Sequence, residues 1–148
     1  MFARNLMRDL VSELEAISEY TYGSVILQEC NNGISELFDS IAKDEMHHFR
    51  LLSVLIRNLG GNPSLNTSLR TKRNDTIGFN EGCRCNRASR RRITDSIRDE
   101  IAANERYTWL AASAPNREAA QILRNIASDE AEHIKRLQAA LSGIPEEQ

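Results

Sequence analysis

Two short segments of the sequence carry the same pair of metal-binding residue types at the same spacing. Glu45 and His48 belong to the run Asp-Glu-Met-His-His, and Glu130 and His133 belong to the run Asp-Glu-Ala-Glu-His. Residues three positions apart lie on the same face of an α-helix, so each pair can present one carboxylate and one imidazole to a single point. Mixed oxygen and imidazole donors suit iron or manganese, and zinc less distinctively. The spacing therefore predicts metal-binding residues on each of two helices.

Apolar residues accompany both pairs at helical spacing, which indicates that the pairs are buried. Along the face of Glu45 they are Ile34, Leu37, Phe38, Ile41, Phe49, Leu52 and Ile56. Along the face of Glu130 they are Ala119, Ile122, Leu123, Ile126, Ile134, Leu137 and Leu141. A carboxylate in such a setting is costly unless it is paired, protonated or bound to a metal. One shared metal site would account for both buried carboxylates.

The two halves of the sequence repeat each other. A shift of 85 positions aligns residues 15–52 with residues 100–137 without a gap, and nine of the 38 aligned pairs are identical. The identical pairs include the residues with useful chemistry, namely Glu15/Glu100, Tyr22/Tyr107, Asp44/Asp129, Glu45/Glu130 and His48/His133. A repeat of this length predicts one helix pair used twice. We therefore expect an all-α fold, an antiparallel four-helix bundle with a pseudo-twofold axis.

Hydrophobic periodicity and turn residues predict four helices and one long crossover. The helices are expected over about residues 3–29, 34–59, 89 or 93 to 113, and 117–141. Residues 60–90 show little periodicity and would form the crossover, which lets the third helix begin at the opposite end of the second. The crossover is basic and could hold phosphate, an acidic partner or nucleic acid, but we favour a solvated connection. The chain, residues 1–148, is expected to form a single domain.

Composition excludes several classes of protein and site. The net charge of −2 argues against nucleic acid or an anionic surface as a partner. No apolar run has the length of a membrane span, and the N-terminal residues lack the apolar core of a signal peptide. Three cysteines, an odd number, predict no disulfide framework, so we expect a reducing cytoplasm. Cys83 and Cys85 have the wrong spacing for a zinc knuckle or a redox Cys-x-x-Cys pair.

Six residues are predicted to meet in the bundle core as metal ligands: Glu15, Glu45, His48, Glu100, Glu130 and His133. Four carboxylates would balance the charge of two divalent ions, which a dry core can hold only as a neutral cluster. Symmetry predicts that Glu45 and Glu130 bridge the two ions. Glu15 would then cap the ion bound by His48, and the symmetry-related glutamate would cap the other.

Four further residues are expected to support these ligands. Metal-bound imidazoles usually donate their other N–H to a carboxylate, and Asp44 and Asp129 are predicted to accept it, either within one helix or crosswise between the halves. Tyr22 and Tyr107 each follow a candidate ligand by seven residues. Two roles are open for these tyrosines. They would fill the core with a hydroxyl satisfied by a carboxylate, or they would orient a ligand and supply an electron.

This ligand pattern resembles that of the ferritin-like superfamily, and within it the rubrerythrin-like and bacterioferritin-like di-iron proteins. The resemblance covers about residues 5–141. It implies two iron ions, with manganese or zinc as alternatives, that react with dioxygen or hydrogen peroxide, and an electron donor that the sequence does not identify. It also implies a homo-oligomer, for which we expect a dimer because the fifth helix typical of storage ferritins is not found.

The chain departs from a full rubrerythrin in two respects. It has no rubredoxin module, and Ile97 and Ala103 occupy positions where rubrerythrins tend to have an additional carboxylate. Both differences favour a bacterioferritin-like ligand set. We expect an oxidoreductase of the ferroxidase or peroxide-reductase type. Two alternatives remain: a metal-binding or iron-sequestering protein with little turnover, and a structural or partner-binding bundle that has kept the ligands without the activity.

Overall fold

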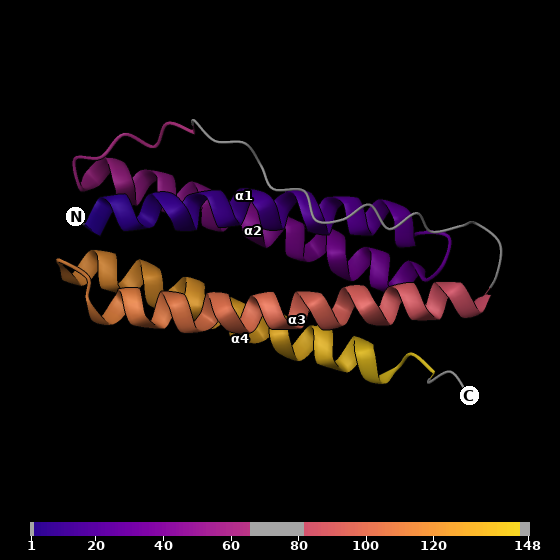
Figure 1. Ribbon diagram of the computed structural model, residues 1–148. Coiled ribbons are helices and arrows are strands. Elements are labelled where there is room, and N and C mark those ends of the chain that lie inside the picture. The colour runs from indigo at the N-terminus through magenta and orange to yellow at the C-terminus, as the bar shows by residue number, and fades with distance from the viewer. Residues whose placement is uncertain (1, 66–81, 146–148) are drawn as a thin grey trace.

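The computed structural model describes residues 2–65 and 82–145, which form four long helices. They are α1 (Phe2–Leu27), α2 (Asn32–Asn58), α3 (Gly82–Ala112) and α4 (Arg117–Ser142). Figure 1 shows α1 beside α2 and α3 beside α4, so that the molecule is two helical hairpins laid against each other. The predicted all-α four-helix bundle is confirmed. No helix within the described residues is long and apolar enough to cross a membrane.

Equivalent asparagines begin the second helix of each hairpin. The side chain of Asn31 accepts a hydrogen bond from the backbone N–H of Ile34, and that of Asn116 accepts one from the backbone N–H of Ala119. Each asparagine thereby satisfies a donor that the first turn of a helix leaves free. Because the two caps are 85 positions apart, α2 and α4 begin at equivalent points of the repeat.

The third helix begins earlier than the sequence predicted. We expected it to start at Ser89 or Ile93, but α3 begins at Gly82. The end of the predicted crossover, residues 82–90, is therefore helical, and a run of arginines and small residues obscures its periodicity. Three of the basic residues assigned to the crossover, Arg70, Lys72 and Arg73, lie outside the described residues.

A disulfide joins Cys30, in the turn after α1, to Cys85, near the start of α3. The expectation of no disulfide is therefore wrong. An odd number of cysteines does not prevent two of them from pairing. The two Cα atoms lie 5.3 Å apart although 55 positions separate the residues in the sequence. The start of α3 therefore lies beside the turn that follows α1.

Two apolar clusters fill the bundle, and buried polar side chains lie between them along the helices. The first cluster includes Leu6, Leu10, Leu52, Leu55, Ile56, Leu110, Leu123 and Ile126. The second cluster includes Leu27, Ile34, Phe38, Ile41, Ile93, Leu137 and Ile144. Apolar packing on both sides keeps water away from the polar layer and fixes the helices that carry it.

Candidate metal centre

Six buried side chains from all four helices meet in the polar layer. The donor atoms form two overlapping groups, and within each group they lie within 4.8 Å of one another. The first group is Glu13, Glu45, His48 and Glu130. The second group is Glu45, Glu100, Glu130 and His133. Two metal positions that share Glu45 and Glu130 would account for this arrangement.

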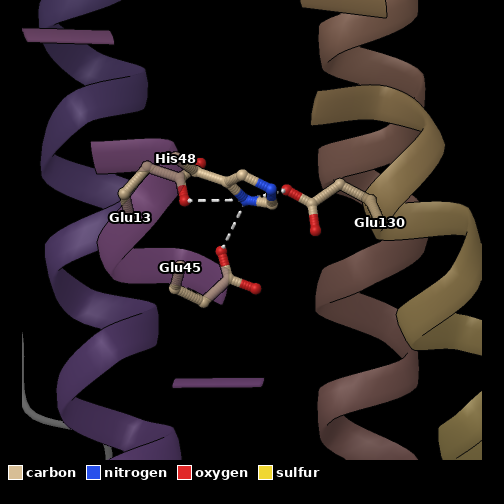
Figure 2. A group of neighbouring side chains, drawn as sticks. All are labelled: Glu13, Glu45, His48 and Glu130. Carbon is tan, nitrogen blue, oxygen red and sulfur yellow. Dashed lines mark hydrogen bonds and ion pairs between the residues drawn. The ribbon is translucent and has the colours of Figure 1, made fainter. Parts of the chain in front are cut away.

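Three carboxylates surround His48 at its Nδ1 atom (Figure 2). This nitrogen lies 3.2 Å from Oε2 of Glu45, 3.3 Å from Oε1 of Glu130 and 3.6 Å from Oε2 of Glu13. Figure 2 shows that Glu130 reaches His48 from the opposite hairpin, whereas Glu13 approaches it from α1. One position can thus take one imidazole and three carboxylate oxygens.

The surroundings of His133 repeat this arrangement. Its Nδ1 atom lies 3.0 Å from Oε2 of Glu130, 3.1 Å from Oε1 of Glu45 and 3.4 Å from Oε2 of Glu100. Glu45 and Glu130 therefore direct one oxygen toward each histidine, as bridging carboxylates do. Glu100 approaches only His133, and its counterpart on α1 approaches only His48.

The counterpart of Glu100 is Glu13, and this differs from the sequence prediction of Glu15. Glu13 is buried, whereas Glu15 is only partly buried and lies outside both donor groups. Residues two positions apart on an α-helix point in directions about 200° apart, so Glu13 and Glu15 cannot face the same point. The shift that relates α1 to α3 is thus 87 positions rather than 85, which the gapless alignment did not reveal.

The same two-residue error affected the tyrosines. Tyr22 was predicted to support the ligands, but it is 48% exposed and its ring lies under the guanidinium of Arg92. Tyr20 is buried and donates a hydrogen bond to Glu100, and Tyr107 is buried and donates one to the glutamate on α1. Each tyrosine therefore supports the capping glutamate of the opposite hairpin. Burial raises the pKa of both hydroxyls, which keeps them protonated as donors.

One signal in the sequence could have identified the correct shift. Tyr20-Thr21-Tyr22 and Tyr107-Thr108-Trp109 align when the shift is 87 positions. The shift of 85 pairs Tyr22 with Tyr107 and aligns neither Tyr20 nor Thr21 with an identical residue. Two identical pairs followed by an aromatic pair, Tyr22 and Trp109, are more specific than one aligned tyrosine, and they point to Glu13.

The two aspartates lie crosswise between the halves, one of the two arrangements that the sequence allowed. Nε2 of His48 lies 3.2 Å from Oδ2 of Asp129, and Nε2 of His133 lies 3.2 Å from Oδ2 of Asp44. An Nε2–H donated to each aspartate leaves Nδ1 of each ring directed toward the carboxylates. The aspartates thus set the ring orientation that metal binding through Nδ1 requires.

Electrostatics separate the bridging glutamates from the capping ones. Burial would raise the pKa of Glu45, but hydrogen bonds to His133 and His48 outweigh it and lower the pKa to about 2. The same balance lowers the pKa of Glu130. Burial dominates at the caps, where it raises the pKa of Glu13 well above its usual range and that of Glu100 to about 8. The metal-free centre therefore holds two ionised and two protonated carboxyl groups.

The histidines supply the balancing positive charge when metal is absent. Burial alone would lower the pKa of His48, but hydrogen bonds to its three carboxylate neighbours raise it far above the usual value. The same competition raises the pKa of His133 to about 12. With two imidazolium ions and two carboxylates, the metal-free centre carries no net charge. A neutral set of six groups is less costly to bury than four bare carboxylates.

The donor set also fits two bound cations. Oε2 of Glu13 and Oε1 of Glu45 are buried and face the Nδ1 atoms of His48 and His133, at 3.6 Å and 3.1 Å, without a well-directed hydrogen bond. A cation between the carboxylates and the Nδ1 atoms would coordinate both oxygens. The four carboxylates, once ionised, balance two divalent charges. These residues therefore fit a di-metal centre in donor type, position and charge.

Comparison with known sequences agrees with the fold and the ligand pattern. The profile of the ferritin-like domain matches residues 3–146. The chain belongs to the ferritin-like family. This confirms the resemblance that the sequence suggested. No curated protein sequence matches this ferritin-like chain significantly.

Solved structures of two bacterial proteins share this fold. Mycobacterium tuberculosis bacterioferritin, BfrA, superposes with a TM-score of 0.75 and 24% identity over 95% of this chain and 84% of its own. The bacterioferritin-related protein from Bacteroides fragilis, described as a dodecameric thioferritin, superposes with a TM-score of 0.67 and 20% identity. The match covers 96% of this chain and 87% of the other. The similarity shows that this chain has the bacterioferritin fold.

Proposed function

We propose that this ferritin-like protein binds two iron ions at the centre and oxidises Fe²⁺ with dioxygen or hydrogen peroxide. The observation that carries the proposal is the division of oxygens, because Glu45 and Glu130 each direct one oxygen toward each histidine. Carboxylates shared in this way would hold two ions next to each other in the polar layer. Two ferrous ions supply two electrons, which with two protons reduce dioxygen to hydrogen peroxide or hydrogen peroxide to two waters.

The chain's own residues prepare the centre by giving up protons. Nδ1 of each histidine and both capping glutamates are protonated in the metal-free protein, so loading two ions displaces about four protons. Tyr20 and Tyr107 then hold the capping carboxylates, and Asp44 and Asp129 hold the imidazole rings. Water is kept out by the apolar clusters on both sides. Manganese or zinc has suitable donors in the same set.

Single-turnover oxidation of Fe²⁺ tests this proposal. Metal-free protein is loaded with two equivalents of Fe²⁺ without oxygen, mixed with dioxygen or hydrogen peroxide, and followed optically. We expect faster oxidation than with the Glu45→Ala variant, which lacks one bridge. Binding without faster oxidation would instead identify an iron-sequestering protein. Failure to bind Fe²⁺ in the buried layer would leave a structural bundle.

The proposal that this chain forms an oligomer rests on a structural relative and not on the described residues. The relative from Bacteroides fragilis is described as dodecameric, and we propose that this chain also forms a homo-oligomer. The expected dimer has no support from these comparisons. Light scattering of the purified protein distinguishes a dimer from a larger assembly, because the masses differ several-fold.

A further inference from the structure

The two aspartates that hold the histidines have different surroundings. Asp129 lies 3.2 Å from His48, and this is its ion pair within the described residues. Asp44 lies 3.2 Å from His133, but the same oxygen also lies 3.4 Å from Nη1 of Arg136. A guanidinium therefore shares the carboxylate on one side of the centre, whereas among the described residues the carboxylate on the other side pairs with its histidine.

Arg136 has no counterpart in the first half of the repeat. The shift of 85 positions that relates α2 to α4 places Leu51 at the equivalent position. Leu51 is uncharged and packs against the first apolar cluster. Arg136 is fixed in place, because its Nη2 donates a 2.8 Å hydrogen bond to Oγ of Ser40. The positive charge is thus a lasting feature of one side only.

We propose that Arg136 makes the two metal positions unequal, so that a divalent cation binds first beside His48 and about tenfold more weakly beside His133. The proposal rests on the di-metal centre described above. A guanidinium repels a cation at the nearer position. It also shares the Asp44 oxygen, so less negative charge is available to make the His133 ring a strong donor.

A purely geometric role for Arg136 is contradicted by the other side of the centre. Asp129 holds His48 at the same 3.2 Å distance without an arginine. The aspartate therefore needs no guanidinium to reach its histidine. Arg136 acts through Asp44 as a positioning residue whose main effect is electrostatic.

Titration of the metal-free protein with Co²⁺, a redox-stable probe, tests the inequality. We expect calorimetry and visible absorption to show two steps, and crystals with one equivalent to show anomalous density beside His48. Arg136→Met should tighten the second step about tenfold and bring the steps together. Arg136→Lys keeps the charge and should keep them apart. Arg124→Met is the control, because Arg124 is exposed and pairs with Gln121.

Each other outcome has a definite meaning. Two equal steps in the wild-type protein, or first occupancy beside His133, would overturn the inference while leaving the di-metal centre intact. A weaker second step in Arg136→Met would overturn it too, because it would show that the arginine helps the site. Absence of Co²⁺ from the buried layer would overturn the proposed function itself. Circular dichroism of every variant verifies that the bundle is folded.

Discussion

The α1–α2 half and the α3–α4 half supply the same set of ligands through different hairpins. Glu45 follows Glu13 by 32 positions, whereas Glu130 follows Glu100 by 30. The capping asparagine precedes the bridging glutamate by 14 positions in both halves, so the extra two residues lie at the C-terminal end of α1. Glu13 and Glu100 therefore occupy equivalent places in the centre although their offsets from the bridging glutamates differ.

The turns explain where the first helix of each hairpin ends. In the second hairpin Pro115 disfavours helical backbone just before it, and α3 ends at Ala112. In the first hairpin residues 28–30 form the turn, and Cys30 ties it to α3. The start of the second helix in each hairpin is therefore fixed by its capping asparagine. The first helix differs in length between its capping glutamate and its C-terminal end.

The largest expected difference is between a bridging and a capping ligand. Glu45→Ala removes a carboxylate from both positions and should cost most of the bound metal, roughly two equivalents. Glu13→Ala removes a ligand from one position and should retain about one equivalent. Glu15→Ala is the matched control and should retain both ions. Metal analysis of folded protein decides this, and loss of metal from the Glu15 variant alone would contradict the assignment of Glu13.

Metal removal should destabilise the bundle, and more so at pH 8 than at pH 5.5. Between these values the folded metal-free protein keeps protons on Glu100 and His133, whose pKa values are about 8 and 12, whereas the unfolded chain releases them. Its stability therefore falls as the pH rises. Metal binding displaces the same protons and becomes stronger, adding several kcal/mol by mass action. Melting temperatures of loaded and stripped protein check the sign; an equal gap at both pH values would refute it.

The disulfide ties the turn of the first hairpin to the start of α3. Cys30→Ser should lower the free energy of unfolding by about 2–4 kcal/mol, because the bond limits the unfolded chain. Cys85→Ser should have the same effect, and Cys83→Ser, which removes the third cysteine, should have little. Denaturant titration measures each change. Three free thiols in the native protein under non-reducing conditions would show that the bond does not form.

Smaller effects are expected from the aspartates. Asp129→Asn should weaken binding beside His48 by about 10–100-fold, since an amide orients the imidazole less firmly than a carboxylate. Asp44→Asn should weaken only the position beside His133. Calorimetric titration with Co²⁺ measures both steps. Equal effects of each variant on the two steps would show that the aspartates do not act on separate histidines.

Sequence patterns alone predicted the helices that carry Glu45, His48, Glu130 and His133. They also predicted that these residues are buried, as they are in the structure. Those inferences needed only the fixed geometry within one helix, where three positions always make about one turn. The internal repeat predicted the four-helix bundle, and the ligand pattern that it shows indicated the resemblance to the ferritin-like family. The same reasoning identified Glu100, because Ile93, Tyr107 and Ala111 recur at helical spacing on its face and are buried.

The packing of the helices was needed to show that Glu13 lies in the centre in place of Glu15. It was also needed to show that Tyr20 contacts a ligand in place of Tyr22. α1 has apolar residues on more than one side, so its periodicity allowed either face, and the correct one depends on how the turn at residues 28–31 rotates α1 against α2. The Cys30–Cys85 bond and the contact between Arg136 and Asp44 also join separate elements. Such contacts depend on the relative rotation and translation of packed helices, which local spacing does not fix.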